Sequence, residues 1–421
     1  MLLVTDIRDD KQRIIEGLKK RNIEDFSVLD KILETDDLRK KTQFDLDNTL
    51  AESNQFSKQI GELYKSGQTD QANKLKEKST SLKEKSKQLQ EALNQYKEEL
   101  DAMLFQIPNA LHTSVVQGKG EEDNVVVLTH GNPEKKDGLP HWDLASKYNL
   151  IDFELGTKIT GAGFPVYIGK GARLQRALIN YFLDKNMAAG YTEVIPPLMV
   201  NEASARGTGQ LPDKEAQMYE VPLDGFYMIP TSEVPLTNIY RDVILETKDF
   251  PVKLTSYTPC FRREAGSYGK DVRGLNRLHQ FDKVEIVRVE KPENSYDALE
   301  DMKNHVASIL EDLGLTYRIL HLCGGDTGFA SASTFDFEVW SETQHRWLEV
   351  SSVSNFETFQ SNRLKLRYKT EKGSELCHTL NGSSLALPRV LASILEQYQV
   401  EDGIEIPEVL TSYAGFNKIE A

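Results

Sequence analysis

The stretch from Thr258 to Glu285 reads TPCFRREAGSYGKDVRGLNRLHQFDKVE, two runs of strand character on either side of a loop that contains three glycines. The simplest structure for this pattern is a long antiparallel β-hairpin. Because side chains alternate between the faces of a strand, polar and aromatic residues collect on one face of each run. On the first run they are Cys260, Arg262 and Glu264, and on the second His279, Phe281, Lys283 and Glu285. Such a surface is a poor core, but it suits a ligand with phosphate, purine and ammonium or hydroxyl groups.

The same stretch concentrates positive charge in a chain whose formal net charge is −14. The cations are Arg262, Arg263, Lys270, Arg273, Arg277 and Lys283, with His279 as a further candidate, around Gly266, Gly269 and Gly274. Arginine binds phosphate through two parallel hydrogen bonds, and an aromatic face stacks a base. The hairpin is therefore predicted to bind a nucleoside triphosphate; the alternative is a solvated hairpin with scattered ion pairs.

Other nucleotide-binding signatures are missing from the sequence. There is no GxxxxGK[ST], the GKG at 169–171 lacks both the spacing and the hydroxyl, and GAGFPV at 161–166 lacks the third glycine of GxGxxG. A nucleotide site in this chain must therefore rely on arginine side chains.

The sequence around the hairpin predicts an α+β fold. Short β-rich runs dominate residues 220–385, and helical patterns occupy about 170–189 and 295–314. Regular strand–helix–strand alternation is rare, so we expect an antiparallel sheet flanked by helices rather than a doubly wound sheet.

Residues 40–100 carry a heptad pattern that predicts two antiparallel helices forming a coiled coil. The first stripe is Leu46, Leu50, Ser53, Ser57, Ile60 and Tyr64, and the second is Leu75, Ser79, Leu82, Ser86, Leu89, Leu93, Tyr96 and Leu100. Ser66-Gly67 breaks the pattern between them and Pro108 ends it. At 1.5 Å per residue, ~27 residues per helix predict a rod roughly 40 Å long.

Six lysines lie between Lys74 and Lys87, against two glutamates. Residues 1–110 hold 19 Lys+Arg against 21 Asp+Glu, so this part is nearly neutral while the remainder is strongly acidic. The lysines are either a solvated helix face or a contact surface for a phosphate backbone.

The whole chain sets further limits. Its 421 residues suffice for two or three domains, expected at 1–110, 111–165 (a loop-rich linker into the core) and 166–421. Cys260, Cys323 and Cys377 are odd in number and far apart, which indicates free thiols in a reducing cytoplasm and no structural zinc. No apolar run is long enough to span a bilayer and the N-terminus lacks a signal-peptide core, so no membrane partner is expected.

Six segments together resemble the class II aminoacyl-tRNA synthetases, in the form seen in the seryl-tRNA synthetases. FRREAG and GLNRLHQF resemble motif 2, GYTEVIPP at 190–197 motif 1, and PTSEVPLTN at 230–238 the serine-binding TxE loop. EVSSVSNFETFQ at 349–360 resembles the metal and ATP strand, HTLNGSSLALPRVLASILEQYQ at 378–399 motif 3, and the basic helical hairpin the family's tRNA-binding arm. The class I HIGH and KMSKS signatures are absent.

The resemblance implies a role for each matching residue. Arg262 and Arg389 are the expected catalytic residues, and Arg262 would bridge the serine carboxylate and the α-phosphate. The expected serine-binding residues are Thr231, Ser232, Glu233, Glu285 and Ser383. The expected ATP-binding residues are Arg262, Arg263, Glu264, Phe281, Glu349, Val350, Ser351, Ser352 and Arg389, with Glu349 and Ser352 also holding Mg²⁺ with ATP. The expected tRNA-binding residues are Lys74, Lys76, Lys83 and Lys85.

The implied activity is ligation of L-serine to tRNA(Ser) through seryl-adenylate by a homodimer; whether tRNA(Sec) is also charged stays open. One rival hypothesis is a homologue that aminoacylates a carrier protein, which would not need the basic arm. Another is a catalytically inactive RNA-binding or scaffold protein, which would not need to retain Arg262, Glu264, Glu349 and Arg389. The sequence departs from the family pattern at Ser384 and Pro388, where motif 3 often has glycines, and Pro388 could alter the turn that leads to Arg389.

Overall fold

The computed structural model describes residues 1–134, 137–213, 216–264 and 273–420. Two compact units divide the chain: one comprises residues 2–15 and 23–108, and the other residue 1, residues 16–22 and residues 109–421. The first is called the arm unit below, and the second the sheet unit.

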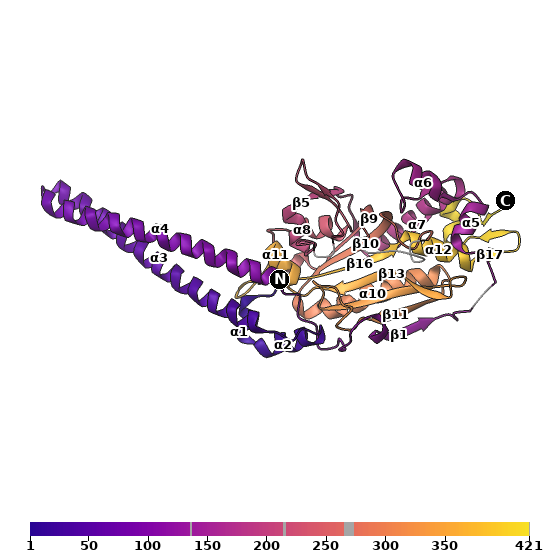
Figure 1. Ribbon diagram of the computed structural model, residues 1–421, viewed down its shortest axis with the longest axis horizontal. Coiled ribbons are helices and arrows are strands. Elements are labelled where there is room, and N and C mark those ends of the chain that lie inside the picture. The colour runs from indigo at the N-terminus through magenta and orange to yellow at the C-terminus, as the bar shows by residue number, and fades with distance from the viewer. Residues whose placement is uncertain (135–136, 214–215, 265–272, 421) are drawn as a thin grey trace. The chain divides into compact units, whose positions relative to one another are not determined.

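The arm unit is built on two long helices that lie side by side (Figure 1), α3 (Ser27–Lys65) and α4 (Thr69–Gln106). The turn between them includes Ser66, which follows the last residue of α3, and Gly67, whose φ of 75° favours glycine. The predicted coiled coil is confirmed, but the helices are longer than expected. With 39 and 38 residues, each spans about 58 Å rather than 40 Å.

The seam of α4 agrees with the sequence, whereas half of the predicted stripe of α3 is wrong. Leu50 and Tyr64 are each 45% exposed, while the preceding Thr49 is buried and Leu63 is partly buried. The contacting residues of α3 are Leu46, Thr49, Ser53, Phe56, Ile60 and Leu63. The predicted stripe and the observed stripe both follow alternating steps of three and four, so the spacing alone could not decide which of them faces α4. The hydroxyl of Thr49 can be buried there because it donates to the carbonyl of Asp45, 2.7 Å away.

Charge pairs anchor the base of the arm unit, where α1 (Val4–Asp9) contacts α3. The buried carboxylate of Asp36 accepts from Arg8 at 3.0 Å and from Arg39 and Lys40 at 2.8 Å. Burial alone would raise the pKa of Asp36, but these three cations hold it at about 2.

The sheet unit contains an eight-stranded sheet in the order β1-β11-β12-β13-β16-β10-β9-β4. Every neighbouring pair is antiparallel except β4–β9, so the predicted antiparallel sheet is confirmed. The strands are β1 (Val125–His130), β4 (Thr192–Glu193), β9 (Val252–Phe261), β10 (Gln280–Glu290), β11 (Tyr317–His321), β12 (Ser333–Ser341), β13 (Arg346–Asn355) and β16 (His378–Ala386). β1 lies within 111–165, the stretch expected to be a linker, and forms one edge of this sheet.

Alternation along the strands separates a core face from a polar face. Val284 and Ile286 on β10 are fully buried in one apolar cluster with side chains of the helices α7 (Gly169–Ala188), α10 (Ser295–Asp312) and α12 (Leu387–Gln397). Lys283 and Glu285, the neighbours of Val284 on β10, point to the opposite face, because neighbouring side chains of a strand alternate. Helices therefore cover one face and leave polar residues on the other. The helical patterns at 170–189 and 295–314 correspond to α7 and α10.

Shorter elements complete the sheet unit (Figure 1). The helices are α5 (His141–Lys147), α6 (Phe153–Ile159), α8 (Glu202–Thr208), α9 (Glu233–Asn238), α11 (Phe359–Leu364) and α13 (Glu408–Ala414), and α2 (Lys11–Lys20) is divided between the two units. The small sheets contain β2 (Ile151–Asp152), β3 (Val166–Tyr167), β5 (Met199–Asn201), β6 (Glu220–Val221), β7 (Phe226–Met228), β8 (Ile244–Leu245), β14 (Arg367–Thr370), β15 (Gly373–Leu376), β17 (Gln399–Val400), β18 (Gly403–Glu405) and β19 (Lys418–Ile419). The three cysteines are buried and free. Among the described helices, none is long and apolar enough to cross a membrane.

Candidate active site

The predicted hairpin is confirmed in its paired part. β9 and β10 are antiparallel, with Phe281 opposite Cys260, Lys283 opposite Thr258 and Glu285 opposite Ser256. The main-chain N–H of Arg262 donates to the carbonyl of His279 at 3.0 Å, which extends the pairing by one step. Of the predicted loop residues, Gly266, Gly269 and Lys270 lie outside the described residues.

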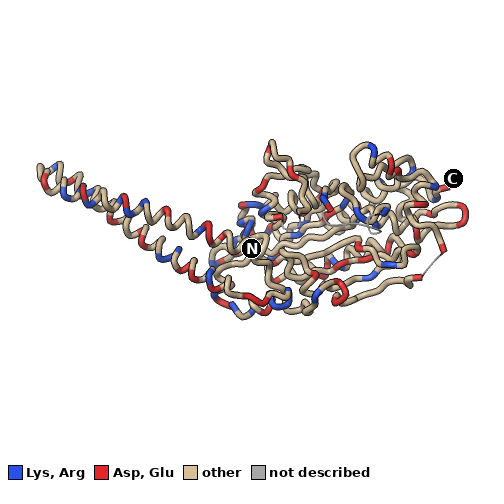
Figure 2. The backbone as a smooth tube through the Cα atoms, viewed as in Figure 1, with Lys and Arg blue, Asp and Glu red and all other residues tan. Residues whose placement is uncertain are grey.

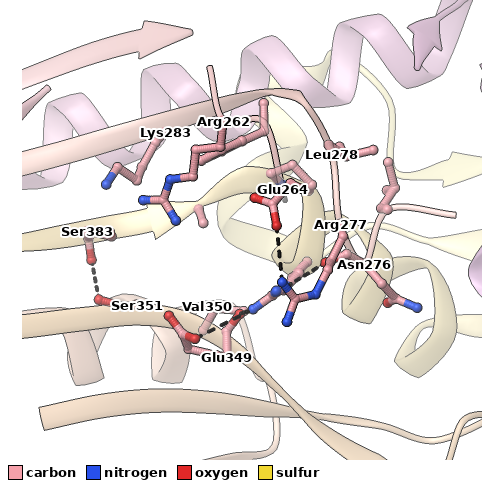
Figure 3. A pocket seen from close by; sticks show the side chains of 15 residues that line it. Arg262, Glu264, Asn276, Arg277, Leu278, Lys283, Glu349, Val350, Ser351 and Ser383 are labelled. Carbon is pink, nitrogen blue, oxygen red and sulfur yellow. Dashed lines mark hydrogen bonds and ion pairs between the residues drawn. The ribbon is translucent and has the colours of Figure 1, made fainter. Parts of the chain in front are cut away.

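Two joined cavities open on the polar face of the sheet. The smaller cavity, about 200 Å³, is lined by residues that include Phe281, Val350 and Pro388. The larger cavity, about 1250 Å³, is lined by residues that include Thr231, Glu233 and Glu285. Eight residues line both cavities: Arg262, Glu264, Asn276, Arg277, Lys283, Glu349, Ser383 and Arg389. Figure 3 shows the close approach of Glu264 to Arg277 and the position of Arg262 beside Lys283.

Arg262 is held from two directions. Its Nε donates to the carbonyl of Pro230 at 3.2 Å, and its guanidinium carbon lies 5.3 Å from the centre of the Phe281 ring. The carboxylate of Glu264 pairs with Nη1 of Arg277 at 3.1 Å. The aromatic ring and the two arginines together form a surface that suits a base and its phosphates.

Motif 3 places Arg389 in the first turn of α12. Pro388 precedes it in that same turn, where a missing N–H costs nothing, so the proline is compatible with the helix start. Nε of Arg389 donates to the carbonyl of Asn276 at 3.0 Å, and Nη1 donates to the carbonyl of Glu349 at 2.7 Å. Ser384 points away from the cavities and donates to Asn186 at 2.8 Å.

A buried cluster of four charged or polar residues lies in the larger cavity. Lys283 pairs with Glu285 at 2.5 Å, and the Thr231 hydroxyl bonds both of them, at 2.9 Å and 3.1 Å. Glu233 accepts from Gln360 at 2.6 Å. Burial, followed by the charge of Glu285, raises the pKa of Glu233 to about 7. The cluster thus has one more carboxylate than cation, which suits a ligand that brings an ammonium group.

A second acidic group lies on β12 and β13. The hydroxyl of Ser352 donates to Asp336 at 2.5 Å and lies 3.5 Å from Glu349. Burial, followed by the charge of Glu349, raises the pKa of Asp336 well above its usual range. Across the described residues, no three His, Cys, Asp or Glu side chains are grouped so as to hold a metal by themselves.

Two of the predicted serine- and ATP-binding residues do not line either cavity. Arg263 is exposed, and the hydroxyl of Ser232 is fully buried 2.5 Å from that of Thr258. Ser351 lines the smaller cavity, but its hydroxyl donates to the carbonyl of Ser383. Cavity residues to which the family resemblance gave no individual role include Asn276, Arg277, Lys283 and Asn381. Of these, Arg277 and Lys283 belong to the cations that the sequence predicted to bind a nucleotide, and strand alternation places Lys283 with Phe281 and Glu285 on one face.

The wall of the larger cavity at residues 328–331 is fixed by two residues from distant parts of the sheet unit. Arg21 donates to the carbonyls of Thr327, Gly328 and Ser331 at 2.7, 3.0 and 2.5 Å. Asn109 binds the remaining two carbonyls, of Phe329 through its main-chain N–H and of Ala330 through its side chain. Five successive carbonyls are thereby satisfied, so this irregular segment is held in one conformation.

Comparisons with known proteins agree with this geometry. The family described as tRNA synthetase class II core domain (G, H, P, S and T) matches residues 219–398, which defines the sheet unit as a class II aminoacyl-tRNA synthetase core. The family described as seryl-tRNA synthetase N-terminal domain matches residues 1–111. A serine–tRNA ligase of Salinibacter ruber is 50% identical over 426 residues, with 100% of both chains covered. The chain belongs to the seryl-tRNA synthetase family.

Two solved structures are similar over the whole chain. The seryl-tRNA synthetase of Pyrococcus horikoshii complexed with ATP has a TM-score of 0.91 at 31% identity, covering 100% of this chain and 99% of that one. The cytoplasmic serine–tRNA ligase of Naegleria fowleri in complex with AMP has a TM-score of 0.88 at 29% identity, with the same coverage.

Proposed function

We propose that this chain activates L-serine with ATP and then transfers the seryl group to the 3′ end of tRNA(Ser). In the first step a carboxylate oxygen of serine attacks the α-phosphorus of ATP, and the bond to the β-phosphate breaks. Pyrophosphate leaves with the bonding electron pair, and seryl-adenylate remains. In the second step a ribose hydroxyl of the terminal nucleotide attacks the seryl carbonyl, and AMP leaves.

The observation that carries this proposal is the position of Arg262 and Lys283 where the two cavities join. The larger cavity has buried carboxylates that suit an amino acid, and the smaller has an aromatic ring and arginines that suit a nucleotide. The reacting carboxylate and α-phosphate, both anionic, would meet between them. Fixed cations at that place stabilise the charge that develops as the new bond forms.

No general base is required for the first step, because the attacking carboxylate is already ionised at neutral pH. The residues proposed to bind serine are Thr231 and Glu233, for its ammonium group, and Glu285 and Ser383, for its hydroxyl. Glu264 is proposed to accept from the adenine amino group, and Phe281 and Arg389 to enclose the ring. Catalysis is then mainly positioning and charge stabilisation.

The acidic group of Glu349, Ser352 and Asp336 fits Mg²⁺ bound together with ATP. Asp336 is a buried carboxylate whose pKa is raised by burial and by the nearby Glu349, so added positive charge would be favourable there. Hard oxygen donors such as Glu349 and Ser352, completed by phosphate oxygens, are the ligands that Mg²⁺ prefers. When bound, Mg²⁺ would neutralise charge on the phosphates.

The proposal extends to the partners of the chain. The exposed lysines of α4, Lys74, Lys76, Lys83 and Lys85 among them, are proposed to contact the phosphate backbone of tRNA. Motif 1, GYTEVIPP at 190–197, is proposed to form the interface of a homodimer. The reaction is proposed to take place in the cytoplasm.

Pyrophosphate exchange into ATP, measured with each amino acid in turn and without tRNA, tests the first step. We expect exchange that depends on serine and Mg²⁺, and Arg262→Ala should lower it by at least ~10²-fold, the scale of losing one preorganised charge stabiliser.

Arg263→Ala is the matched control, because Arg263 is the adjacent arginine but lines neither cavity; its rate should stay within about threefold of the wild type, as for a surface residue. Exchange driven by another amino acid would refute the substrate, and equal rates in the two variants would remove Arg262 from the mechanism.

A further inference from the structure

His141 and Glu396 form a pair that is completely buried in the sheet unit, with both side chains 0% exposed. Nδ1 of His141 lies 2.8 Å from Oε1 of Glu396, and the main-chain N–H of His141 donates to the same oxygen at 3.1 Å. The hydroxyl of Ser341 donates to the other carboxylate oxygen. Burial alone would raise the pKa of Glu396, but the hydrogen bonds from His141 and Ser341 lower it. A buried ionic group of this kind adds little net stability, so another reason for its presence is needed.

The other ring nitrogen of His141 binds the hairpin. The main-chain N–H of Leu275 donates to Nε2 at 2.9 Å, so Nε2 must be unprotonated and the ring proton must lie on Nδ1, where Glu396 accepts it. The carboxylate therefore selects the one tautomer that can accept from Leu275. Glu396 on α12 thus orients the imidazole, and the imidazole in turn positions the main chain of the hairpin.

Three consecutive residues of α5 contact three consecutive residues of the hairpin. Besides the bond to Leu275, the guanidinium carbon of Arg273 lies 4.6 Å from the ring centre of Trp142, and Arg273 lies 4.0 Å from Asp143. Gly274, between them, has a φ of 66°, and a Cβ there would overlap the His141 ring. The close approach of this main chain to the imidazole is thus built into the sequence.

The residues that follow Leu275 line the smaller cavity, which is proposed to bind ATP. The carbonyl of Asn276 accepts from Arg389, Arg277 pairs with Glu264, and all four residues line both cavities. Arg389 and Glu396 belong to the same helix, α12, one near its start and one near its end. The segment 275–277 is therefore attached to α12 twice, directly through Arg389 and indirectly through His141.

We infer that His141 is a positioning residue for ATP: oriented by Glu396, it fixes the main chain at Leu275 and so sets the places of Asn276 and Arg277 in the cavity. The inference rests on the proposed use of that cavity for ATP. His141 touches neither cavity itself, so its loss should affect ATP and leave serine binding, which depends on Thr231, Glu233 and Glu285, nearly unchanged.

Two substitutions at position 141 separate the two hydrogen bonds of the ring. The amide of glutamine reaches about as far as Nε2 and offers Leu275 an acceptor, whereas the shorter amide of asparagine reaches about as far as Nδ1 and can bond Glu396 alone. In serine-dependent pyrophosphate exchange, His141→Asn should raise the KM for ATP by about tenfold, the scale of removing one hydrogen bond, with the KM for serine within about twofold. His141→Gln should return the KM for ATP to within about threefold of the wild type.

His305→Gln is the control for removing a partly buried imidazole elsewhere in the sheet unit. His305 bonds Asn186 at 2.7 Å and does not contact the hairpin segment 273–277, so this variant should lose stability without a change in the KM for ATP. The affinity of each variant for a non-hydrolysable ATP analogue with Mg²⁺, measured by calorimetry, tests the role of His141 separately from the proposed function. If the wild type shows no exchange with serine, the proposed function fails, while the affinities still test His141.

Equal ATP affinities for the glutamine and asparagine variants would overturn the inference, and so would a parallel rise in the KM for serine. If the variants do not fold, the tautomer is the second test. In protein labelled with ¹⁵N-histidine, the ring nitrogen shifts of His141 should report a proton on Nδ1. A proton on Nε2 would exclude the bond from Leu275 and the inference with it.

Discussion

Glu233 and Glu285 share one cation, Lys283, inside the larger cavity. Only Glu285 is directly paired with that lysine, whereas the partners of Glu233 include the neutral amides of Gln360 and Asn381. Because of this asymmetry, the ionisation state of Glu233 matters for the proposed binding of the serine ammonium group. Ionising this carboxylate without a ligand costs about 3 kcal/mol more than ionising a glutamate with the ordinary pKa of 4.5, because the pKa of Glu233 is raised to about 7. A ligand with an ammonium group would recover that free energy.

The affinity for serine should consequently depend on pH. Because the folded-state pKa of Glu233 is raised, this side chain is mostly protonated below about pH 7. The protonated form contributes to the free energy of unfolding, and this contribution is lost as pH rises through about 7. Serine should need the ionised form, so its KM should fall about tenfold per unit as pH rises toward 7 and then level off. The KM for serine in pyrophosphate exchange at several pH values measures this.

Glu233→Gln keeps the shape of the side chain and removes the titration. Its KM for serine should be high and nearly independent of pH, while the KM for ATP of both proteins should stay flat over the same range. A wild-type KM for serine that does not change between about pH 5.5 and 7.5 would show that the ammonium group is bound elsewhere.

At the same scale, the sequence predicted which face of the hairpin carries the site, because alternation follows directly from strand geometry. It could not predict that Ser232 turns into the interior to meet Thr258, since that depends on the path of a loop between β7 and α9. It also could not assign Arg277 to Glu264, because the two are separated by the hairpin loop and only the fold brings them together.

At the scale of elements, the heptad pattern predicted the buried stripe of a helix correctly where one residue type dominated that stripe. The leucines of α4 fixed its seam, whereas α3 offers Thr49 or Leu50 and Leu63 or Tyr64 at adjacent positions, and the partner helix decides between them. The strand β1 was missed for a different reason. Residues 125–128 are all apolar, so the sequence shows no alternation of apolar and polar side chains, and all six residues of the strand are exposed.

The confirmed seam of α4 leaves its lysines exposed, and Figure 2 shows basic and acidic residues interspersed along the two long helices. If Lys83 and Lys85 bind phosphates, replacing both by glutamine should weaken tRNA binding. The slope of log affinity against log salt should become shallower by up to about one unit for each phosphate that is no longer bound. Filter binding of tRNA(Ser) at several salt concentrations measures this slope, and serine-dependent exchange without tRNA should be unaffected.

Lys41→Gln with Lys58→Gln is the matched control, since it removes two exposed charges from α3 in the same arm unit. A flattened slope in this control, equal to that of the α4 variant, would indicate a general charge effect instead of a contact surface on α4.

At the scale of the whole molecule, the two units differ in how much they depend on distant contacts. The arm unit is mostly one pair of helices joined by a short turn, which a local pattern can predict. The main sheet orders its strands as β1-β11-β12-β13-β16-β10-β9-β4. Four of the seven neighbouring pairs join strands that are not consecutive along the chain, and no local signal sets those pairings. The family resemblance, rather than the pattern of residues, was what predicted the positions of the motifs within it.

The proposed homodimer can be tested in motif 1 itself and in the residues directly after it. Beyond β4, an edge strand of the main sheet, Ile195 is 88% exposed and Met199 is 51% exposed, an unusual place for large apolar side chains on a solvated edge. Burial of such side chains against a second copy would stabilise a dimer, so the wild type should sediment with twice the 47.7 kDa mass of the chain. Ile195→Asp should shift the equilibrium toward the monomer by introducing a charge into that contact. Leu223→Asp is the control, because Leu223 is 99% exposed but lies in the turn between β6 and β7. If both variants sediment like the wild type, Ile195 is not part of the interface; if the wild type itself sediments as a monomer, the homodimer is wrong.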